Sequence, residues 1–225
     1  MKKSNIRERI LYEDNHLIIV NKIAGEIVQG DKTGDEPLLE VVRTYIKDKY
    51  QKPGNVFCGL VHRIDRPVSG AVIFAKTSKG LERMNALVKD RNIRKIYWAI
   101  VEGHLEKESD TLVHFLRKNE KLNKSFCVSE TDKDAQKATL SYHVLKHLNN
   151  YTLVEVELHS GRHHQIRVQL SAIGHCIKGD LKYGAKRSNP DGSISLHAHQ
   201  LIFEHPVSHQ SINVIAPWDE PLSII

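Results

Sequence analysis

His62-Arg63-Ile64-Asp65-Arg66-Pro67-Val68-Ser69-Gly70 is the stretch of this sequence that most restricts its fold and its chemistry. It holds one carboxylate, Asp65, between Arg63 and Arg66, and it ends in a Ser-Gly turn. Guanidinium neighbours favour the ionised form of a carboxylate, and a single carboxylate among cations suits nucleophilic work better than paired acid and base work. We therefore predict that Asp65 is a nucleophile. The same run by itself is also typical of a surface ion-pair network around a turn.

The segments beside this stretch place Asp65 at the entrance of a strand. Residues 17–20 and 71–75 are continuous apolar runs typical of buried strands. Apolar residues at helical spacing predict a helix over residues 38–50, and Ser78 is the predicted cap of a second helix.

The middle of the chain predicts more strands. Residues 95–101 read as a strand, whereas the polar, lysine-rich residues 106–136 predict loops and short strands. Residues 138–145 and 151–158 predict a hairpin, because the turn Leu148-Asn149-Asn150 separates them.

A second dense region, Ser160-Gly161-Arg162-His163-His164-Gln165-Ile166-Arg167, leads into a predicted short helix that Gly174 ends. Arg167 borders the apolar stripe of this helix, so we expect it to point inward. An inward arginine could meet the carboxylate of Asp65 in a bidentate pair. The alternative is an arginine whose stem covers the core and whose head reaches solvent.

Composition fits one globular domain. The 225 residues are 40% hydrophobic and 27% charged, which is ordinary for a chain that folds by itself. We therefore expect a single domain over residues 1–225. The formal net charge of +6 favours a polyanionic partner.

The three cysteines are far apart and form no C-x-x-C pair, which argues against a disulfide framework and a thiolate zinc site. No apolar signal core or bilayer-length run is found in the sequence. We expect a cytoplasmic protein that does not bind membranes.

Several motifs together, from about Leu17 to Pro217, resemble the RluA-type pseudouridine synthase family, and their order makes chance similarity improbable. The matching segments are Ile19-Val20-Asn21-Lys22-Ile23-Ala24-Gly25, the Asp65 stretch, Arg94-Lys95-Ile96-Tyr97, the segment from Ser160 to Arg167 with Gly174-His175, Gly179-Asp180 and Tyr183-Gly184, and Leu196-His197-Ala198-His199 with His205-Pro206.

Four positions depart from the family's usual residues. Ile23 and Cys176 stand where proline is usual, Val68 where threonine is usual, and Gln169 where histidine is usual. None of these departures removes a catalytic group. They therefore put in doubt which RNA sequence is the target more than which reaction is catalysed. The family's frequent N-terminal S4 domain is also not expected here, which leaves RNA binding to the catalytic domain or to a partner.

The resemblance implies an α+β fold, with a mixed, mainly antiparallel sheet flanked by helices and a central cleft that holds Asp65. It implies isomerisation of uridine to pseudouridine in structured RNA, either ribosomal or transfer RNA, without a cofactor or a metal. We expect a monomer that binds RNA and not DNA.

The resemblance also assigns roles to residues of the proposed site. Asp65 would be the catalytic carboxylate, and the sequence leaves open whether it adds to the base or assists at the ribose. Arg167 would hold that carboxylate, with Arg162 as second choice, and Tyr97 would stack on the extruded base. Without the resemblance, Tyr97 would read as a strand aromatic in the core.

RNA contacts are expected from a second group of side chains. Arg63 would fill the space left by the flipped nucleotide or hold a phosphate, the alternative being a plain salt bridge. Candidate contacts to the RNA backbone are Lys22, Arg66, Arg162 and the polar stretch containing Lys118, Lys121 and Lys124. The alternative for any single lysine among them is a solvated surface role.

Two other classes of function compete with this interpretation. His159, His163 and His164 lie close together in sequence, but no H-E-x-x-H motif or cysteine companion supports a metal site. A non-catalytic RNA-binding or RNA-remodelling protein that keeps the fold is the other alternative. Intact Asp65, Tyr97 and Arg167 argue against it.

Overall fold

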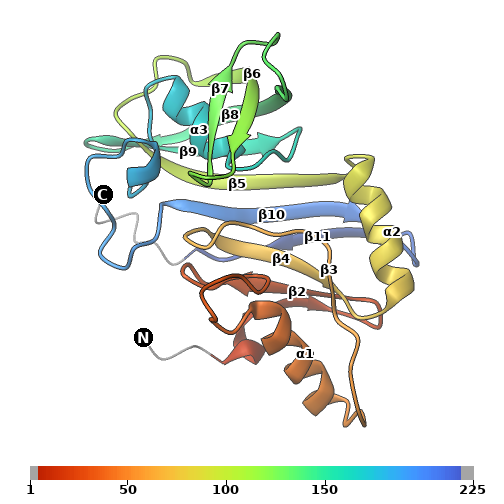
Figure 1. Ribbon diagram of the computed structural model, residues 1–225. Helices are drawn as coiled ribbons and strands as arrows, with labels where there is room; N and C mark the ends of the chain where they lie inside the picture. The colour runs from red at the N-terminus through yellow and green to blue at the C-terminus, as the bar shows by residue number, and fades with distance from the viewer. Residues whose placement is uncertain (1–4, 219–225) are drawn as a thin grey trace. The chain divides into compact units, whose positions relative to one another are not determined.

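The computed structural model of the chain describes residues 5–218, which form two compact units. The first unit comprises residues 5–93 and 198–218, and the second comprises residues 94–197. Both combine antiparallel strands with helices, so the α+β class is confirmed (Figure 1). The single domain over residues 1–225 stays a prediction.

The first unit is built on strands that bring sequence-distant segments together. Its strand order is β1-β2-β4-β10, with β11 paired to β10 and β3 paired to β4. The elements are η1 (Ile6–Arg9), β1 (Ile10–Glu13), β2 (Leu17–Lys22), α1 (Leu38–Lys49), β3 (Gly59–Leu60), β4 (Ser69–Ala75), α2 (Ser78–Lys89), β10 (Leu196–Glu204), whose first two residues belong to the second unit, and β11 (Ser211–Ile215).

Strands β2 and β4 form the centre of this unit. They are antiparallel, with Leu17 opposite Ala75 and Lys22 opposite Gly70. Both faces of β2 are covered, because all four residues from Leu17 to Val20 are buried. The pairing fixes the end of β2 beside the start of β4, which is where the turn containing Asp65 leads into the sheet.

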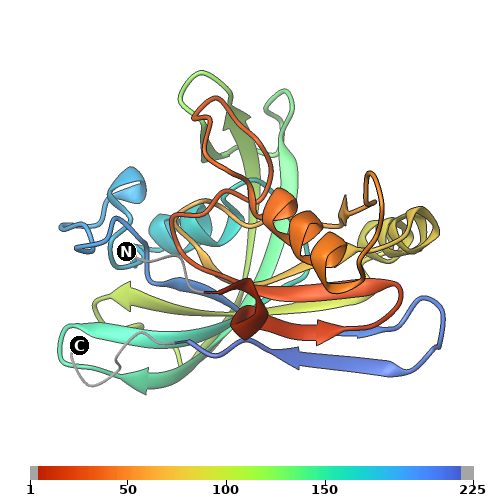
Figure 2. The ribbon, with the colours of Figure 1, turned by 90° about the horizontal axis from the view of Figure 1, so that it is seen from below.

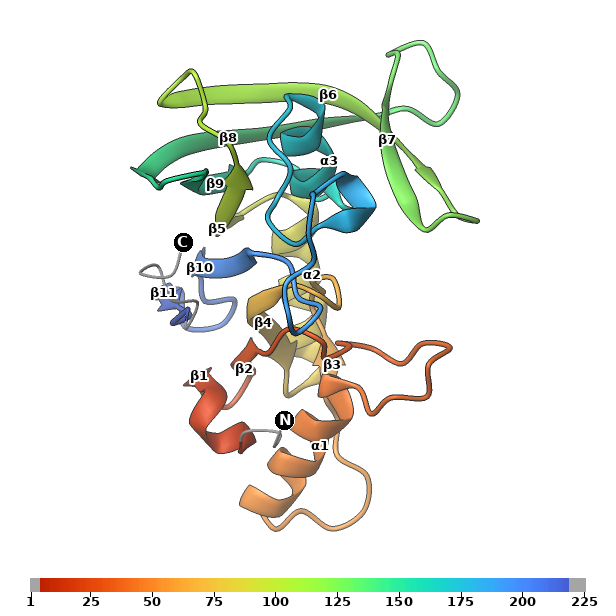
Figure 3. The same cartoon turned by 90° about the vertical axis from the view of Figure 1, so that its left-hand side faces the viewer.

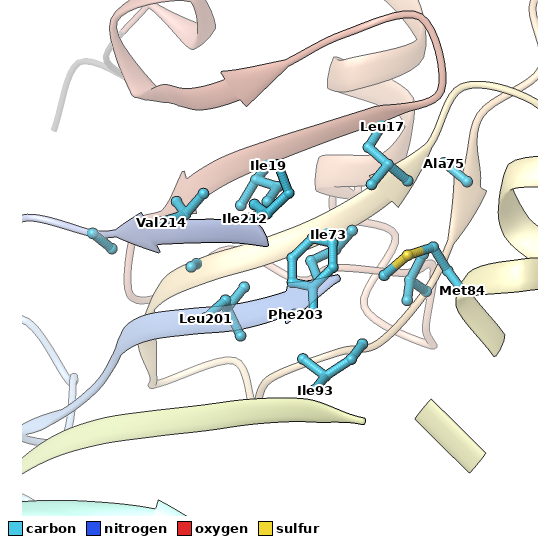
Figure 4. Packing of buried hydrophobic residues seen from close by; sticks show 13 residues of the cluster. Leu17, Ile19, Ile73, Ala75, Met84, Ile93, Leu201, Phe203, Ile212 and Val214 are labelled. Carbon is cyan, nitrogen blue, oxygen red and sulfur yellow. The ribbon is translucent and has the colours of Figure 1, made fainter. Parts of the chain in front are cut away.

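An apolar cluster joins the strands of this unit to α2. Figure 4 shows side chains of β2, β4, β10 and β11 in one cluster that also contains Met84 of α2. Leu81 and Val88 lie three and four residues from Met84 and pack against the same cluster, as the helical spacing predicts. Helices α1 and α2 lie on one side of the strands in Figures 2 and 3.

The start of α2 differs from the prediction by one residue. The cap is Thr77, in extended conformation, whose hydroxyl accepts a hydrogen bond from the backbone N–H of Gly80. Ser78, the predicted cap, is the first helical residue. Serine and threonine are both good N-caps, and the spacing to an available N–H decides between them.

The second unit has the strand order β5-β9-β8-β6-β7. Its elements are β5 (Ile93–Glu102), which starts at the last residue of the first unit, β6 (Ser109–Asn119), β7 (Lys124–Val128), β8 (Gln136–His147), β9 (Tyr151–Leu158), α3 (Gln165–Ala172) and η2 (Leu181–Tyr183). The predicted hairpin of β8 and β9 is confirmed.

The lysine-rich segment is more regular than predicted. Instead of loops and short strands, it contains the 11-residue strand β6, which pairs with both β7 and β8. Only Leu112 and Leu116 are buried in β6. A strand with so few buried residues lacks the apolar alternation by which strands are recognised in sequence. Helix α3 contacts β6 and β7 (Figure 3).

No helix within residues 5–218 is long and apolar enough to cross a membrane.

A polar network fastens α1 to β1 and to Lys76, the residue after β4. Glu13 accepts hydrogen bonds from Lys49 Nζ at 2.7 Å, Lys76 Nζ at 2.9 Å and the hydroxyls of Tyr45 and Tyr50. Burial by itself raises the pKa of Glu13, but these hydrogen bonds outweigh it and lower the pKa from 4.5 to about 2. Folding therefore favours the charged carboxylate.

This network makes stability depend on pH in a defined direction. Because the pKa of Glu13 is lowered in the folded chain, its contribution is complete above the unfolded value of 4.5 and is lost as the pH falls toward 2. We expect Glu13→Gln to cost about 2 kcal/mol at pH 7, as expected for hydrogen bonds to a charged group. Urea unfolding of both proteins between pH 7 and 3 should show this difference shrinking. A difference that is independent of pH would contradict the account.

Candidate active site

The turn that carries Asp65 is fixed by backbone and side-chain donors. The carbonyl oxygen of Asp65 accepts a hydrogen bond from Val68 N–H at 3.0 Å, which closes the turn. The next carbonyl oxygen, that of Arg66, accepts from Gly25 N–H at 2.8 Å and from Lys22 Nζ at 3.1 Å. Asp65 itself is half-buried, four residues before β4, as predicted. The backbone beside Asp65 is therefore held from two directions.

Lys22 is a buried cation at the end of β2. It is 1% exposed, and its ammonium donates to the carbonyl oxygens of Ile23 and Arg66. Burial lowers the pKa of Lys22 to about 7, while the charges of Glu26 and Asp65 act to raise it. This burial is at odds with the prediction that Lys22 contacts the RNA backbone. Lys22 shares a face of β2 with Ile18 and Val20, but the other face of the strand is equally buried, so no pattern in the sequence signalled this burial.

Gly70 is required where the Asp65 stretch enters the sheet. Its φ is +116°, and a Cβ there would lie 2.4 Å from both the backbone nitrogen and the carbonyl oxygen of Ala198 in β10. Backbone atoms at that distance cannot be moved aside by a side-chain rotation. The glycine that ends the motif therefore permits the close approach of β4 and β10.

The two arginines beside Asp65 lie at the surface. Arg63 and Arg66 are both exposed. Arg66 Nη2 donates to Asp35 at 2.6 Å, and both side chains of this pair are about half exposed, so the pair contributes little to stability.

Arg167 is buried in the second unit and points inward, as predicted. Its Nε and Nη2 donate to the two carboxylate oxygens of Asp180 at 2.7 and 2.8 Å. Both side chains are almost fully buried, at 6% and 1% exposure. Asp180 was not predicted as the partner of Arg167, although it lies in the Gly179-Asp180 segment of the family resemblance. A carboxylate this deeply buried requires a charged partner.

Tyr183 extends this cluster to β7. The guanidinium carbon of Arg167 lies 5.0 Å from the centre of the Tyr183 ring, and Lys124 Nζ lies 4.9 Å from it. The Tyr183 hydroxyl accepts from Ser125 N–H and is 2.9 Å from Nδ1 of His164. Helix α3, η2 and β7 are thereby joined around Arg167.

The remaining predicted residues also lie in the second unit. Tyr97 is 8% exposed and sits within β5, opposite Val156 of β9. Arg162 is half-buried in the turn before α3, where its Nε donates to the carbonyl oxygen of Lys137 at 3.2 Å. The structure thus brings Lys22, Asp65 and Arg66 together in one unit and places Tyr97, Arg162 and Arg167 in the other.

The adjacent side chains of His163 and His164 interact with other protein groups and with each other. His163 Nδ1 is 2.9 Å from Ser125 Oγ, and the rings of His163 and His164 stack at 3.8 Å. Over residues 5–218, His, Cys, Asp and Glu side chains form no group of three that could hold a metal ion.

Comparison with known proteins places these features in a family context. The sequence model described as RNA pseudouridylate synthase matches residues 16–172. An uncharacterized RNA pseudouridine synthase of Synechocystis is 34% identical over 217 residues, which cover 95% of this chain and 66% of that protein. The ribosomal large subunit pseudouridine synthase C of Vibrio cholerae is 32% identical, over 98% of this chain and 69% of its own length. The chain thus spans about two thirds of these relatives.

A solved structure supports the fold. The human RNA pseudouridylate synthase domain containing 4 protein aligns with a TM-score of 0.79 and 23% identity, over 96% of this chain and 90% of that one.

The geometry at Gly70 predicts a large loss of stability on substitution. A positive φ alone costs an L residue about 1–2 kcal/mol, and the clash with Ala198 adds to this in Gly70→Ala. Gly174→Ala is the matched control, because its φ is +88° but nothing lies within 4 Å of the added Cβ. Urea unfolding should show that Gly70→Ala loses clearly more than the control. Equal losses would mean that the approach of β10 is not a constraint.

Proposed function

The chain belongs to the RNA pseudouridylate synthase family, and from this we propose that it isomerises uridine to pseudouridine in structured RNA with Asp65 as the catalytic residue. The observation that carries the proposal is the turn that holds a half-buried Asp65 beside the buried ammonium of Lys22. A reactive carboxylate must be held in place, and this turn is fixed by donors from β2 and from Gly25.

The reaction is an isomerisation whose atoms balance. The bond between N1 of uracil and C1′ of the ribose breaks, the uracil turns, and a bond forms between C5 and C1′. The hydrogen at C5 is released and N1 gains a proton, so neither an oxidant nor a cofactor is consumed. Asp65 acts either by adding to the base or by assisting at the ribose.

We propose that Arg167 holds the Asp65 carboxylate during this reaction. The support is chemical, because a guanidinium carries five N–H donors and can bind more than one carboxylate. The bidentate pair with Asp180 fixes the plane of the Arg167 guanidinium. Arg162, the second choice, already donates through Nε to a backbone carbonyl oxygen.

Base flipping gives the other predicted residues their roles. A uridine must leave its stack before Asp65 can reach it, at a cost of a few kcal/mol. We propose that Tyr97 stacks on the extruded uracil, and that exposed Arg63 and Arg66 bind the RNA around the vacated position. Lys22 is assigned instead to holding the turn that carries Asp65.

Ribosomal RNA is the first substrate to test, ahead of transfer RNA. Relatives that cover this chain almost completely are named for the ribosomal large subunit, in Vibrio cholerae and in Zymomonas mobilis. The cytoplasmic location, the monomeric state and a cleft that holds Asp65 stay predictions.

Tritium release from C5-labelled uridine tests the reaction. The substrate is total RNA from cells that lack this protein, divided into ribosomal and transfer RNA. We expect release by the wild-type chain and a loss of at least about 1,000-fold in Asp65→Asn, as is typical when a covalent or acid-base group is removed. Asp48→Asn, at an exposed position of α1, is the control and should retain full activity.

The same assay separates the enzyme from its alternative. If no variant releases tritium while all bind RNA equally, the chain is a non-catalytic RNA-binding protein and the proposal fails.

Arg167→Lys tests the guanidinium. Lysine keeps the positive charge but cannot hold two oxygens of Asp180 in one plane, so we expect tritium release to fall at least about tenfold. Circular dichroism and the urea midpoint would show whether the fold survives. If the Arg167→Lys protein kept its activity, residue 167 would supply only positive charge, and the planar guanidinium would not be needed.

A further inference from the structure

A pocket with a volume of about 750 Å³ lies within the second unit, at the end of β5. Its wall includes Glu102 of β5, Asn149 and Tyr151 at the turn between β8 and β9, and three cations, Lys178, Lys186 and Arg187. None of these residues has a role in the proposed isomerisation. A pocket of this volume is within the range of small-molecule sites.

The pocket has an excess of positive charge. Among the residues described in its wall, Glu102 is the only acidic one, against three cationic side chains. The carboxylate of Glu102 accepts a hydrogen bond from the backbone N–H of Lys186 at 2.9 Å. The hydrogen bond from the Ser193 hydroxyl lowers the pKa of the nearby Asp191 carboxyl group, and the charge of Lys178 acts in the same direction. Lys186 and Arg187 are both exposed. Adjacent exposed cations above a polar hollow favour a phosphate group.

The walls are held by backbone hydrogen bonds rather than by the pocket side chains themselves. Gly103 N–H donates to the carbonyl oxygen of Asn150 at 2.9 Å, which joins the end of β5 to the β8–β9 turn. Lys178 N–H donates to Ile100 and its carbonyl oxygen accepts from Ser195, both at 2.9 Å. These bonds fix the parts of the wall that come from the end of β5, from the β8–β9 turn and from Lys178.

The pocket is distinct from the position proposed for the uracil. Glu102 follows Tyr97 by five residues in β5, and at about 3.3 Å per residue their Cα atoms are roughly 16 Å apart. That distance is longer than one nucleotide, so the pocket and the proposed uracil position would be occupied by different nucleotides.

We propose that this pocket binds a nucleotide of the RNA substrate other than the target uridine, with its phosphate at Lys186 and Arg187 and its base or sugar against Tyr151 and Asn149. This inference rests on the proposed function, because it assumes RNA as the partner. RNA is favoured over a free nucleotide since the cations are exposed and the chain carries a net charge of +6.

The test removes the two exposed cations. Lys186→Gln with Arg187→Gln is compared with Lys47→Gln and Lys133→Gln, two exposed lysines outside the pocket, so that both double variants lose two charges. The probe is fragmented total RNA, with binding measured from 50 to 300 mM KCl. We expect the pocket variant to bind about tenfold more weakly, with a salt slope smaller by about 1–2, and the control to change little. In the tritium assay, KM should rise in the pocket variant while kcat stays the same.

Two outcomes would overturn the proposal. One is equal affinity and equal salt slope for both double variants. The other is a pocket variant that binds RNA as the wild-type chain does but no longer shows the thermal shift that uridine monophosphate gives the wild-type chain. That result would assign the pocket to a free nucleotide. Neither depends on catalysis, so a wild-type chain that released no tritium would refute the proposed function and leave the RNA-binding comparison valid.

Discussion

The buried ammonium of Lys22 donates to the carbonyl oxygen of Arg66, and this contact ties the end of β2 to the turn that presents Asp65. Burying a cation is costly, and it is tolerated here because two carbonyl oxygens accept its hydrogens and carboxylates lie close enough to act on its charge. The pairing of Lys22 with Gly70 and the missing side chain at Gly70 complete the same constraint. The first unit thus fixes the backbone of a short loop while leaving Arg63 and Arg66 at the surface.

The second unit also holds a buried cation in place, but this cation is proposed to bind the Asp65 carboxylate and not the backbone beside it. Arg167 is held by both oxygens of Asp180 and lies against the ring of Tyr183, whose hydroxyl is bound by β7 and by His164. A guanidinium fixed in its plane can orient a carboxylate, whereas a mobile one would lose conformational entropy on doing so. The proposed chemistry therefore depends on two side chains, Asp65 and Arg167, each of which is positioned by its own unit.

Sequence patterns predicted the elements whose apolar residues repeat. Helix α1 and strands β2 and β4 lie where expected because their buried residues follow helical or continuous spacing. The long strand β6 escaped prediction because few of its residues are buried. The motifs pointed to Asp65, and helical spacing gave the inward direction of Arg167. The burial of Lys22 and the pairing of Arg167 with Asp180 needed the structure, since no spacing in the sequence names the partner of a buried charge.

Mapping pseudouridine nucleotide by nucleotide in cellular RNA tests the central claim most directly, that the carboxylate of Asp65 makes this chain an RNA pseudouridine synthase. Strains without the gene, with the wild-type gene and with Asp65→Asn would be compared at equal protein levels. The account predicts at least one pseudouridine that is present only with the wild-type gene, and its position would name the target RNA. The same pseudouridines in all three strains, or their restoration by Asp65→Asn, would contradict it.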